Sequence, residues 1–225
     1  HASDLCRQML AYSGRGELST APLNLNELVE EIAGLLQISV SKRVAMQYEL
    51  APNLPLIEGD ATQLRQVVMN LITNASDAIG DRNGSITVTT GTLECDLDYL
   101  QTTFINERLD AGLYIFFEVA DTGCGMTKET IEKIFDPFFT TKVTGRGLGL
   151  AAVLGIVQGH RGAVKVYSEP EHGTTFKVLL PAAKHQDLQQ FEKGAHAPEM
   201  QWQPEGNILL VDDDGVVAGR IGGVQ

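Results

Sequence analysis

Residues 70–77 (NLITNASD), 121–125 (DTGCG), 135–139 (FDPFF) and 145–149 (GRGLG) are the stretches that decide the fold of this chain. Each is short and common by itself. Their order and spacing together predict a nucleotide pocket made from a helix, a glycine turn and a glycine-rich lid. A P-loop or dinucleotide-binding fold would place one glycine cluster directly after its first strand. Here the glycines come late and in two clusters, which argues against both folds.

The apolar periodicity around these stretches predicts alternating helices and strands. The predicted elements are helix 24–41, strand 44–50, helix 61–79, strand 85–92, loop 96–110, strand 113–120, helix 127–133, helix 147–159, strand 163–168 and strand 173–180. Asp60 and Gln63 read as a capping box that opens the helix over 61–79. This irregular order predicts an α/β sandwich, in which helices cover one face of a mixed β-sheet and a lid lies between the Phe-rich and Gly-rich stretches.

The chain divides into four parts by composition. Residues 1–20 contain a short helix over 2–13 that is marginal alone and is expected to belong to a longer bundle. Residues 21–183 form the main domain, and residues 184–206 read as a polar linker. Residues 207–225 begin with a buried-type strand, NILLVDDD, but do not complete a domain.

Charge and composition limit the function classes. The net charge of -12 argues against non-specific nucleic-acid binding, which relies on Lys and Arg. An apolar share of 43% suffices for a core, and no apolar run is long enough to span a membrane. Three scattered cysteines indicate neither a disulfide framework nor a zinc site. We therefore expect a cytoplasmic location. A longer parent protein could still carry a membrane segment.

On the helix over 61–79, the side chains Asn70, Asn74 and Asp77 fall within a sector of roughly 60° at one edge of the apolar stripe. Polar residues at such a border often line a cleft, and an amide oxygen is a hard ligand suited to Mg²⁺. The alternative is an ordinary solvated face.

The glycine turn follows an apolar strand that delivers Asp121 to its end. A carboxylate there can accept a hydrogen bond from an exocyclic amine such as that of adenine, while Gly123 and Gly125 let the backbone approach a flat ligand. A plain strand-end turn is the alternative. Further along, Lys142 is within reach of a phosphate, although exposed lysines are common.

The segment Gly145, Gly147, Leu148 and Gly149 opens a helix, whose unpaired N–H groups attract phosphates. A hinge without a binding role is the alternative. None of the five histidines forms a metal-spaced pair or stands beside a Ser or Cys nucleophile, so a hydrolase triad is not supported.

Taken together, these motifs resemble the catalytic ATP-binding domain of sensor histidine kinases, over residues 21–183. The wider superfamily includes DNA gyrase, the ninety-kilodalton heat-shock chaperones and the MutL repair proteins. The Phe-rich stretch favours the kinase branch. The resemblance implies an enzyme that binds ATP and Mg²⁺ and transfers the γ-phosphoryl group to a histidine.

The resemblance also assigns roles to individual residues. It implies that Asn74 is the principal Mg²⁺ ligand, with Asn70 one turn earlier beside the phosphates as catalytic residue and second possible metal ligand. Gyrase-like branches have a glutamate where Asn70 stands, so its absence favours transfer to a protein over hydrolysis. Asp77 matches a nitrogen-sensor-like subgroup, where many related kinases have lysine or tyrosine.

The remaining nucleotide contacts implied by the resemblance follow the motifs along the chain. They are Asp121, Gly123 and Gly125 at the base, Phe138 and Lys142 near the lid, Gly145, Gly147, Leu148 and Gly149 in the phosphate cradle, and Thr174 on the strand that helps to hold adenine.

The flanks imply a fragment of a larger, hybrid-type kinase. Residues 1–20 resemble the end of the second helix of a dimerisation bundle, and residues 207–225 resemble the truncated start of a receiver domain, with Asp213 and Asp214 as its acidic pair. The implied partners are the histidine-bearing dimerisation helix, a receiver or response regulator, and a second copy of the parent. We expect this stretch alone to bind ATP without phosphorylating itself. An ATP-hydrolysing clamp of the same superfamily and a degenerate docking module are the alternatives.

Overall fold

Strand β5 (Gly112–Asp121) is the centre of a five-stranded mixed sheet, whose order is β2-β4-β5-β7-β6. The other strands are β2 (Val44–Leu50), β4 (Gly84–Cys95), β7 (Gly173–Pro181) and β6 (Ala163–Glu169). Only β2 and β4 run parallel, and the other three pairs are antiparallel. The mixed sheet predicted from the sequence is therefore confirmed.

The computed structural model describes residues 19–36, 43–104, 109–142, 145–183, 207–212 and 215–220. The chain forms two units, 1–185 and 186–225. The predicted helix over 2–13, the linker over 184–206 and the acidic pair Asp213 and Asp214 lie outside the described residues. No helix among the described residues is long and apolar enough to cross a membrane.

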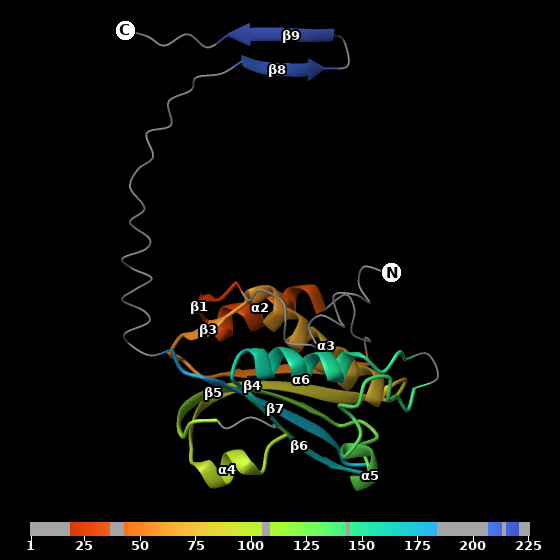
Figure 1. Cartoon of the computed structure of the whole chain (residues 1–225). Coiled ribbons are helices and arrows are strands. Elements are labelled where there is room, and N and C mark those ends of the chain that lie inside the picture. The colour runs from red at the N-terminus through yellow and green to blue at the C-terminus, as the bar shows by residue number, and fades with distance from the viewer. Residues whose placement is uncertain are drawn as a thin grey trace. The chain divides into compact units, whose positions relative to one another are not determined.

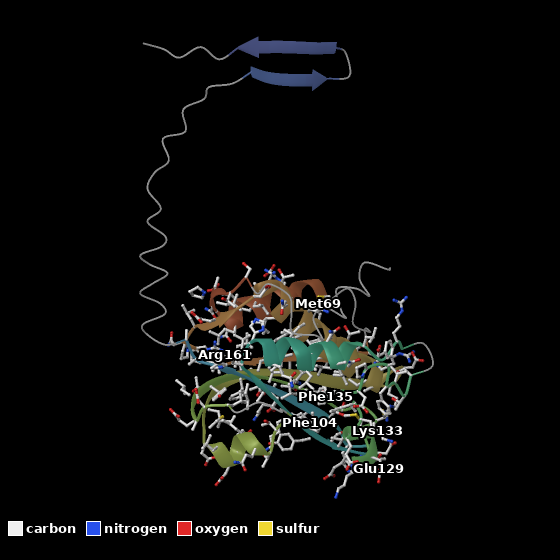
Figure 2. All side chains as sticks on the ribbon, in the orientation of Figure 1. Met69, Phe104, Glu129, Lys133, Phe135 and Arg161 are labelled. Atoms are coloured by element: carbon white, nitrogen blue, oxygen red, sulfur yellow. The ribbon has the colours of Figure 1, made fainter. Side chains whose placement is uncertain are left out.

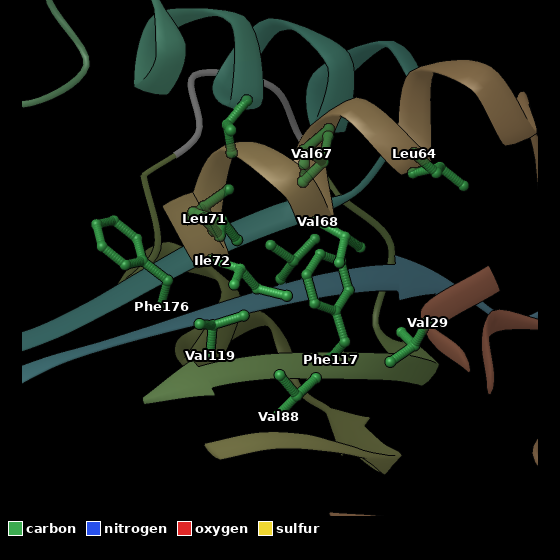
Figure 3. Packing of buried hydrophobic residues seen from close by; sticks show 14 of the residues in the cluster. Val29, Leu64, Val67, Val68, Leu71, Ile72, Val88, Phe117, Val119 and Phe176 are labelled. Carbon is green, nitrogen blue, oxygen red and sulfur yellow. The ribbon is translucent and has the colours of Figure 1, made fainter. Parts of the chain in front are cut away.

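Three helices cover one face of the sheet, as predicted: α2 (Leu25–Leu36), α3 (Ala61–Ile79) and α6 (Gly149–Gly159) (Figure 1). Helix α3 is the main contact because its apolar residues recur at helical spacing. Its buried residues are Leu64, Val67, Val68, Leu71, Ile72, Ala75 and Ile79. They pack onto inward-facing residues of the sheet, among them Phe117 and Val119 of β5 (Figure 3).

The start of α3 is capped as predicted, but with an unexpected partner. The Asp60 carboxylate accepts from the backbone N–H groups of Thr62 at 2.9 Å and Gln63 at 3.1 Å. The reciprocal half of a capping box would have the Gln63 side chain accept from the Asp60 N–H. Instead, the Asp60 N–H donates to Nε2 of His160, just beyond α6, at 2.9 Å.

The opposite face carries a smaller apolar cluster under helix α4 (Leu97–Gln101). The loop predicted over 96–110 was thus wrong in its first part, and β4 extends to Cys95 rather than ending at 92. Asp96 caps α4 by accepting from the Tyr99 N–H at 2.7 Å. Leu100 then packs with Tyr114 and Leu179 on this face of the sheet.

Several short elements escaped the sequence reading or shifted. Strands β1 (Ala21–Leu23) and β3 (Ile57–Gly59) pair antiparallel and were not predicted. Helix α5 covers only Lys128–Ile131, and α6 begins at Gly149 rather than at 147. Three residues give no usable periodicity, so strands as short as β1 and β3 are recognised only from their pairing.

The second unit contains one described hairpin. Strand β8 (Asn207–Asp212) was expected from its apolar run. It pairs antiparallel with β9 (Gly215–Arg220), for which no strand was predicted.

Candidate functional site

A cavity of about 600 Å³ lies where the end of α3, the end of β5, the start of β7 and the segment leading into α6 meet. This volume is in the range of roughly 300–1,000 Å³ that small-molecule pockets usually have. Of the predicted site residues, ten line it: Asn74, Asp77, Asp121, Gly125, Lys142, Gly145, Gly147, Leu148, Gly149 and Thr174.

One end of the cavity is formed by Asp121, the last residue of β5, which is 8% exposed. Its carboxylate accepts from the Gly123 N–H at 2.7 Å. Burial raises the pKa of the Asp121 carboxyl group, and the backbone N–H groups of Gly123 and Thr174 act in the opposite direction. A carboxylate accepts up to about four hydrogen bonds, so Asp121 keeps acceptor capacity for a ligand amine.

Thr174 stands directly opposite Asp121 in the β5–β7 register and is also buried. Its hydroxyl lies 2.9 Å from Oγ of Ser168, and Ser168 donates to the carbonyl of Gly173 at 3.0 Å. A serine hydroxyl has one proton. Since that proton is given to Gly173, the Thr174 hydroxyl donates to Ser168, and its oxygen is left to accept from a ligand. Thr174 and Asp121 thus present two neighbouring acceptors.

The glycine turn after Asp121 is held between α3 and the β6–β7 hairpin. The Cys124 N–H donates to the carbonyl of Ala78 at 3.1 Å, and the Cys124 carbonyl accepts from the Glu171 N–H at 2.8 Å. Gly125 has a φ of 63°, and a Cβ there would collide with the carbonyl of Glu169. Glycine is required at this position because both the conformation and the space exclude a side chain.

The walls between the two ends of the cavity are largely apolar, and the sequence reading did not identify them. The lining residues that it missed are Ala78, Cys124, Met126, Thr130, Ile134, Phe139, Thr140, Thr141, Arg146, Leu150 and Phe176. Phe176 could have been found, because it lies two residues after Thr174 on the same face of β7. Apolar walls suit a flat, aromatic ligand.

The other end of the cavity carries charges. The Lys142 ammonium group contacts Oδ1 of Asn74 at 2.9 Å and Oδ2 of Asp77 at 2.7 Å. Asn74 and Asp77 are three residues apart on α3 and therefore lie on one face of the helix. Two of the three residues of the predicted polar edge of α3, Asn74 and Asp77, thus line the cavity.

The glycine-rich segment passes beside this charged end. Gly147 has a φ of 66°, and its carbonyl accepts from the Phe138 N–H at 2.8 Å. Gly149 begins α6 next to Asn70, whose side-chain amide donates to the Gly149 carbonyl at 3.4 Å. The N-cap residue is Leu148, whose side chain has no group that could accept from the first N–H groups of α6.

Three predicted site residues do not line the cavity. Asn70 stands behind Gly149, and Gly123 packs against Ala78. The Phe138 side chain is 61% exposed, whereas its neighbour Phe139 does line the cavity.

The Phe-rich stretch also anchors the loop in which it stands. Phe135 is buried, and its ring centroid lies 5.0 Å from that of Phe104 (Figure 2). This ring contact therefore fixes the loop to the core through Phe135.

The residues at the charged end fit a magnesium ion. Mg²⁺ prefers oxygen ligands, keeps several waters and is often held by one or two carboxylates together with substrate phosphates. Asn74 and Asp77 offer one amide and one carboxylate oxygen, and a cationic group, Lys142, already lies on both. The described residues contain no cluster of three or more His, Cys, Asp or Glu side chains that could hold a metal alone.

Comparisons with known proteins identify the family to which the chain belongs. Residues 59–184 match the family described as histidine kinase-, DNA gyrase B-, and HSP90-like ATPase. The sensor kinase CckA of Brucella abortus is 35% identical over 231 residues, which is 100% of this chain and 24% of that protein. The sensory histidine kinase/phosphatase NtrB of Rhizobium meliloti is 35% identical over 80% of this chain and 46% of its own length. The chain thus spans less than half of either relative.

Solved structures give the same fold. The catalytic domain of histidine kinase ThkA superposes with a TM-score of 0.58 at 30% identity, over 73% of this chain and 96% of its own. Full-length ShkA in complex with AMPPNP superposes with a TM-score of 0.62 at 27% sequence identity, over 82% of this chain and 36% of its own. ThkA in complex with the response regulator protein TrrA superposes with a TM-score of 0.59 at 28% sequence identity, over 81% of this chain and 47% of the solved chain.

Proposed function

This chain belongs to the family of histidine kinase-, DNA gyrase B- and HSP90-like ATPases, as an ATP-binding kinase catalytic domain, and we propose that it transfers the γ-phosphoryl group of ATP to a histidine. That histidine stands on a dimerisation helix of a longer sensor kinase. The observation that carries the proposal is that one cavity has two chemically different ends. Two acceptors suited to adenine, Asp121 and Thr174, stand at one end, and the polar group of Asn74, Asp77 and Lys142 stands at the other.

The adenine end is proposed to select its base by hydrogen-bond direction. The Asp121 carboxylate and the Thr174 hydroxyl both accept, so they match a base that offers an exocyclic amine. Guanine bound in the same pose would place its 6-carbonyl oxygen where adenine places the 6-amino group, so the acceptors facing that position would remain unpaired. Leaving a buried acceptor unpaired costs about 1–3 kcal/mol.

At the phosphate end, Asn74 is proposed to hold Mg²⁺, with Asn70 as the second possible ligand. The bound ion would neutralise charge on the triphosphate, since phosphoryl transfer depends mainly on positioning and charge stabilisation. Gly145, Gly147 and Gly149 let the backbone approach the phosphates, and the first N–H groups of α6 can donate to them. Asn70 fixes the start of α6 through its bond to the Gly149 carbonyl.

Transfer to a protein is favoured over hydrolysis by the chemistry of Asn70. A carboxylate at this position could take a proton from an attacking water, but a carboxamide cannot. We therefore do not favour the ATP-hydrolysing clamp. The longer parent is proposed to pair with a second copy of itself and to pass its phosphoryl group to a receiver domain or response regulator, the class of partner that ThkA has in its complex with TrrA.

The first experiment is a calorimetric titration with AMPPNP, with and without Mg²⁺, of the wild-type chain and of Asp121→Asn. We expect Mg²⁺-dependent binding that weakens by at least about tenfold in the variant, because hydrogen bonds to charged groups contribute about 1.5–3 kcal/mol. No binding by the folded wild-type chain would contradict the proposal. Steady-state ATP hydrolysis that is lost in Asn70→Ala would favour the clamp instead.

A further inference from the structure

Lys142 is the residue whose position the proposed function does not explain. In this arrangement its ammonium group lies on Oδ1 of Asn74 and Oδ2 of Asp77, at 2.9 and 2.7 Å. The two partners are 68 and 65 residues away in sequence, so the contact ties the lid segment to α3. A lysine that served only the triphosphate would not need to reach these two oxygens.

The lysine and a metal ion cannot hold these oxygens together. Mg²⁺ binds oxygen at about 2.0–2.1 Å, closer than an ammonium group does. An ion on Asn74 Oδ1 would therefore lie within a few ångströms of the Lys142 ammonium group. Both the ion and the ammonium group are positively charged, so at that distance they repel each other.

We propose that Lys142 competes with a divalent cation for Asn74 and Asp77, so that metal binding releases the lysine into the cavity that receives the triphosphate. Asp77 is the side chain that holds Lys142 in place, which gives a role to the residue that departs from the usual lysine or tyrosine. This inference rests on the proposed function in that it places the metal at Asn74. Metal binding and the availability of Lys142 for phosphate thus become one event.

The expected change in metal affinity follows from how exposed the Lys142–Asp77 ion pair is. The side chains of Lys142 and Asp77 are 38% and 50% exposed, so water screens their ion pair. Partly exposed ion pairs are weak, and releasing one should change metal affinity by about two- to tenfold rather than by orders of magnitude.

The test uses Mn²⁺ alone as the probe, because it prefers the same oxygen ligands and is detected by electron paramagnetic resonance. Lys142→Met is compared with the wild-type chain and with Lys133→Met. Lys133 is exposed and lies outside the cavity lining, so its variant removes the same charge without touching Asn74 (Figure 2). We expect Lys142→Met to bind Mn²⁺ about two- to tenfold more tightly than both other proteins. Equal or weaker binding, or no binding by any of the three, would overturn the proposal.

A second measurement follows the lysine itself. Lysine acylation by an amine-reactive reagent, read residue by residue by mass spectrometry, reports whether the Lys142 amine is engaged. Saturating Mn²⁺ should raise its acylation rate several-fold and leave that of Lys133 unchanged. An unchanged Lys142 rate under metal saturation would contradict release.

AMPPNP titration at saturating Mn²⁺, where Lys142 is expected to be released, separates this inference from the proposed function. Lys142→Met should weaken that binding while it strengthens Mn²⁺ binding, and a residue that only supports the fold would not move the two affinities in opposite directions. If Lys142→Met binds Mn²⁺ more tightly than the wild-type chain but the wild-type chain binds no AMPPNP, the proposed function fails and the inference stands. If AMPPNP binds and Mn²⁺ affinity is insensitive to Lys142, the inference alone fails.

Discussion

At the scale of single residues, Asp121 is a ligand-binding group whose burial lowers the stability of the fold at neutral pH. Burial raises the pKa of its carboxyl group above the ordinary value of 3.8 because the charged form loses hydration. A carboxyl group with a raised pKa stabilises the fold below the pKa of the unfolded chain and loses that contribution as the pH rises through the folded value. At neutral pH the ionised Asp121 is therefore unfavourable for folding, although a ligand amine would use it.

We predict that Asp121→Asn is more stable than the wild-type chain at pH 7, even though it binds nucleotide poorly. The amide oxygen can still accept from the Gly123 N–H, and no buried charge remains. Urea unfolding between pH 4 and 8 measures the difference, which should grow in favour of the variant as the pH rises above 3.8. A difference that shrinks with rising pH would contradict this account.

At Gly125, both the backbone conformation and the surrounding space exclude a side chain. Gly125→Ala should lose at least about 2 kcal/mol of unfolding free energy, because a left-handed conformation alone costs a non-glycine residue about 1–2 kcal/mol and its Cβ would strike the Glu169 carbonyl. Gly34→Ala is the matched control. Gly34 is helical and has open space around it, so alanine there should stabilise by about 0.5–1 kcal/mol. Chemical denaturation of both variants checks the opposite signs.

At the scale of elements, His160 joins the two helices that carry the site. Because the Asp60 N–H donates to Nε2 of His160, that nitrogen carries no proton. The neutral ring therefore has its proton on Nδ1, which donates to the Ile156 carbonyl at 2.8 Å. The ring thus satisfies one group at the start of α3 and one at the end of α6.

His160→Phe is predicted to destabilise the chain by about 1–3 kcal/mol, since it leaves the half-buried Asp60 N–H without an acceptor. His172 is exposed in the β6–β7 turn, and His172→Phe should stay within about 0.5 kcal/mol of the wild-type chain. Equilibrium unfolding of the two variants compares them. Equal effects would mean that His160 contributes only its volume.

At the scale of the whole molecule, the cavity is assembled from segments far apart in sequence. Asp121 comes from the central strand, Asn74 from α3 and Gly149 from the start of α6. A ligand that binds across these segments binds only the folded chain, so it must stabilise that chain as a unit.

ADP or AMPPNP at a hundred times its Kd should raise the free energy of unfolding by about 2.7 kcal/mol. GTP at the same concentration should raise it far less, because Asp121 and Thr174 both accept hydrogen bonds. Urea denaturation with each nucleotide, repeated on Asp121→Asn, measures the effect. Equal stabilisation by GTP would show that the base end does not discriminate as proposed.

Sequence periodicity was sufficient to predict α3, β5 and β7, because each places apolar residues at a regular spacing against one core. It failed for β1 and β3, which are too short to show a period, and for α4, whose signal was only the cap at Asp96. The polar ends of the cavity were also predictable. Asn74 and Asp121 are residue types that bury poorly unless they have a partner, whereas Thr174 followed only from the resemblance to histidine kinases.

By itself, the sequence determined the class of this protein: a mixed sheet under helices, with two glycine clusters and an asparagine-bearing helix around one pocket. Backbone sterics and hydrophobic spacing are local properties, and they can be read from the order of residues. The tertiary structure alone decided the bond from Asp60 to His160, the apolar walls of the cavity and the contact of Lys142 with Asn74 and Asp77. Each of these joins residues from separate elements, and only the packed chain fixes such distances.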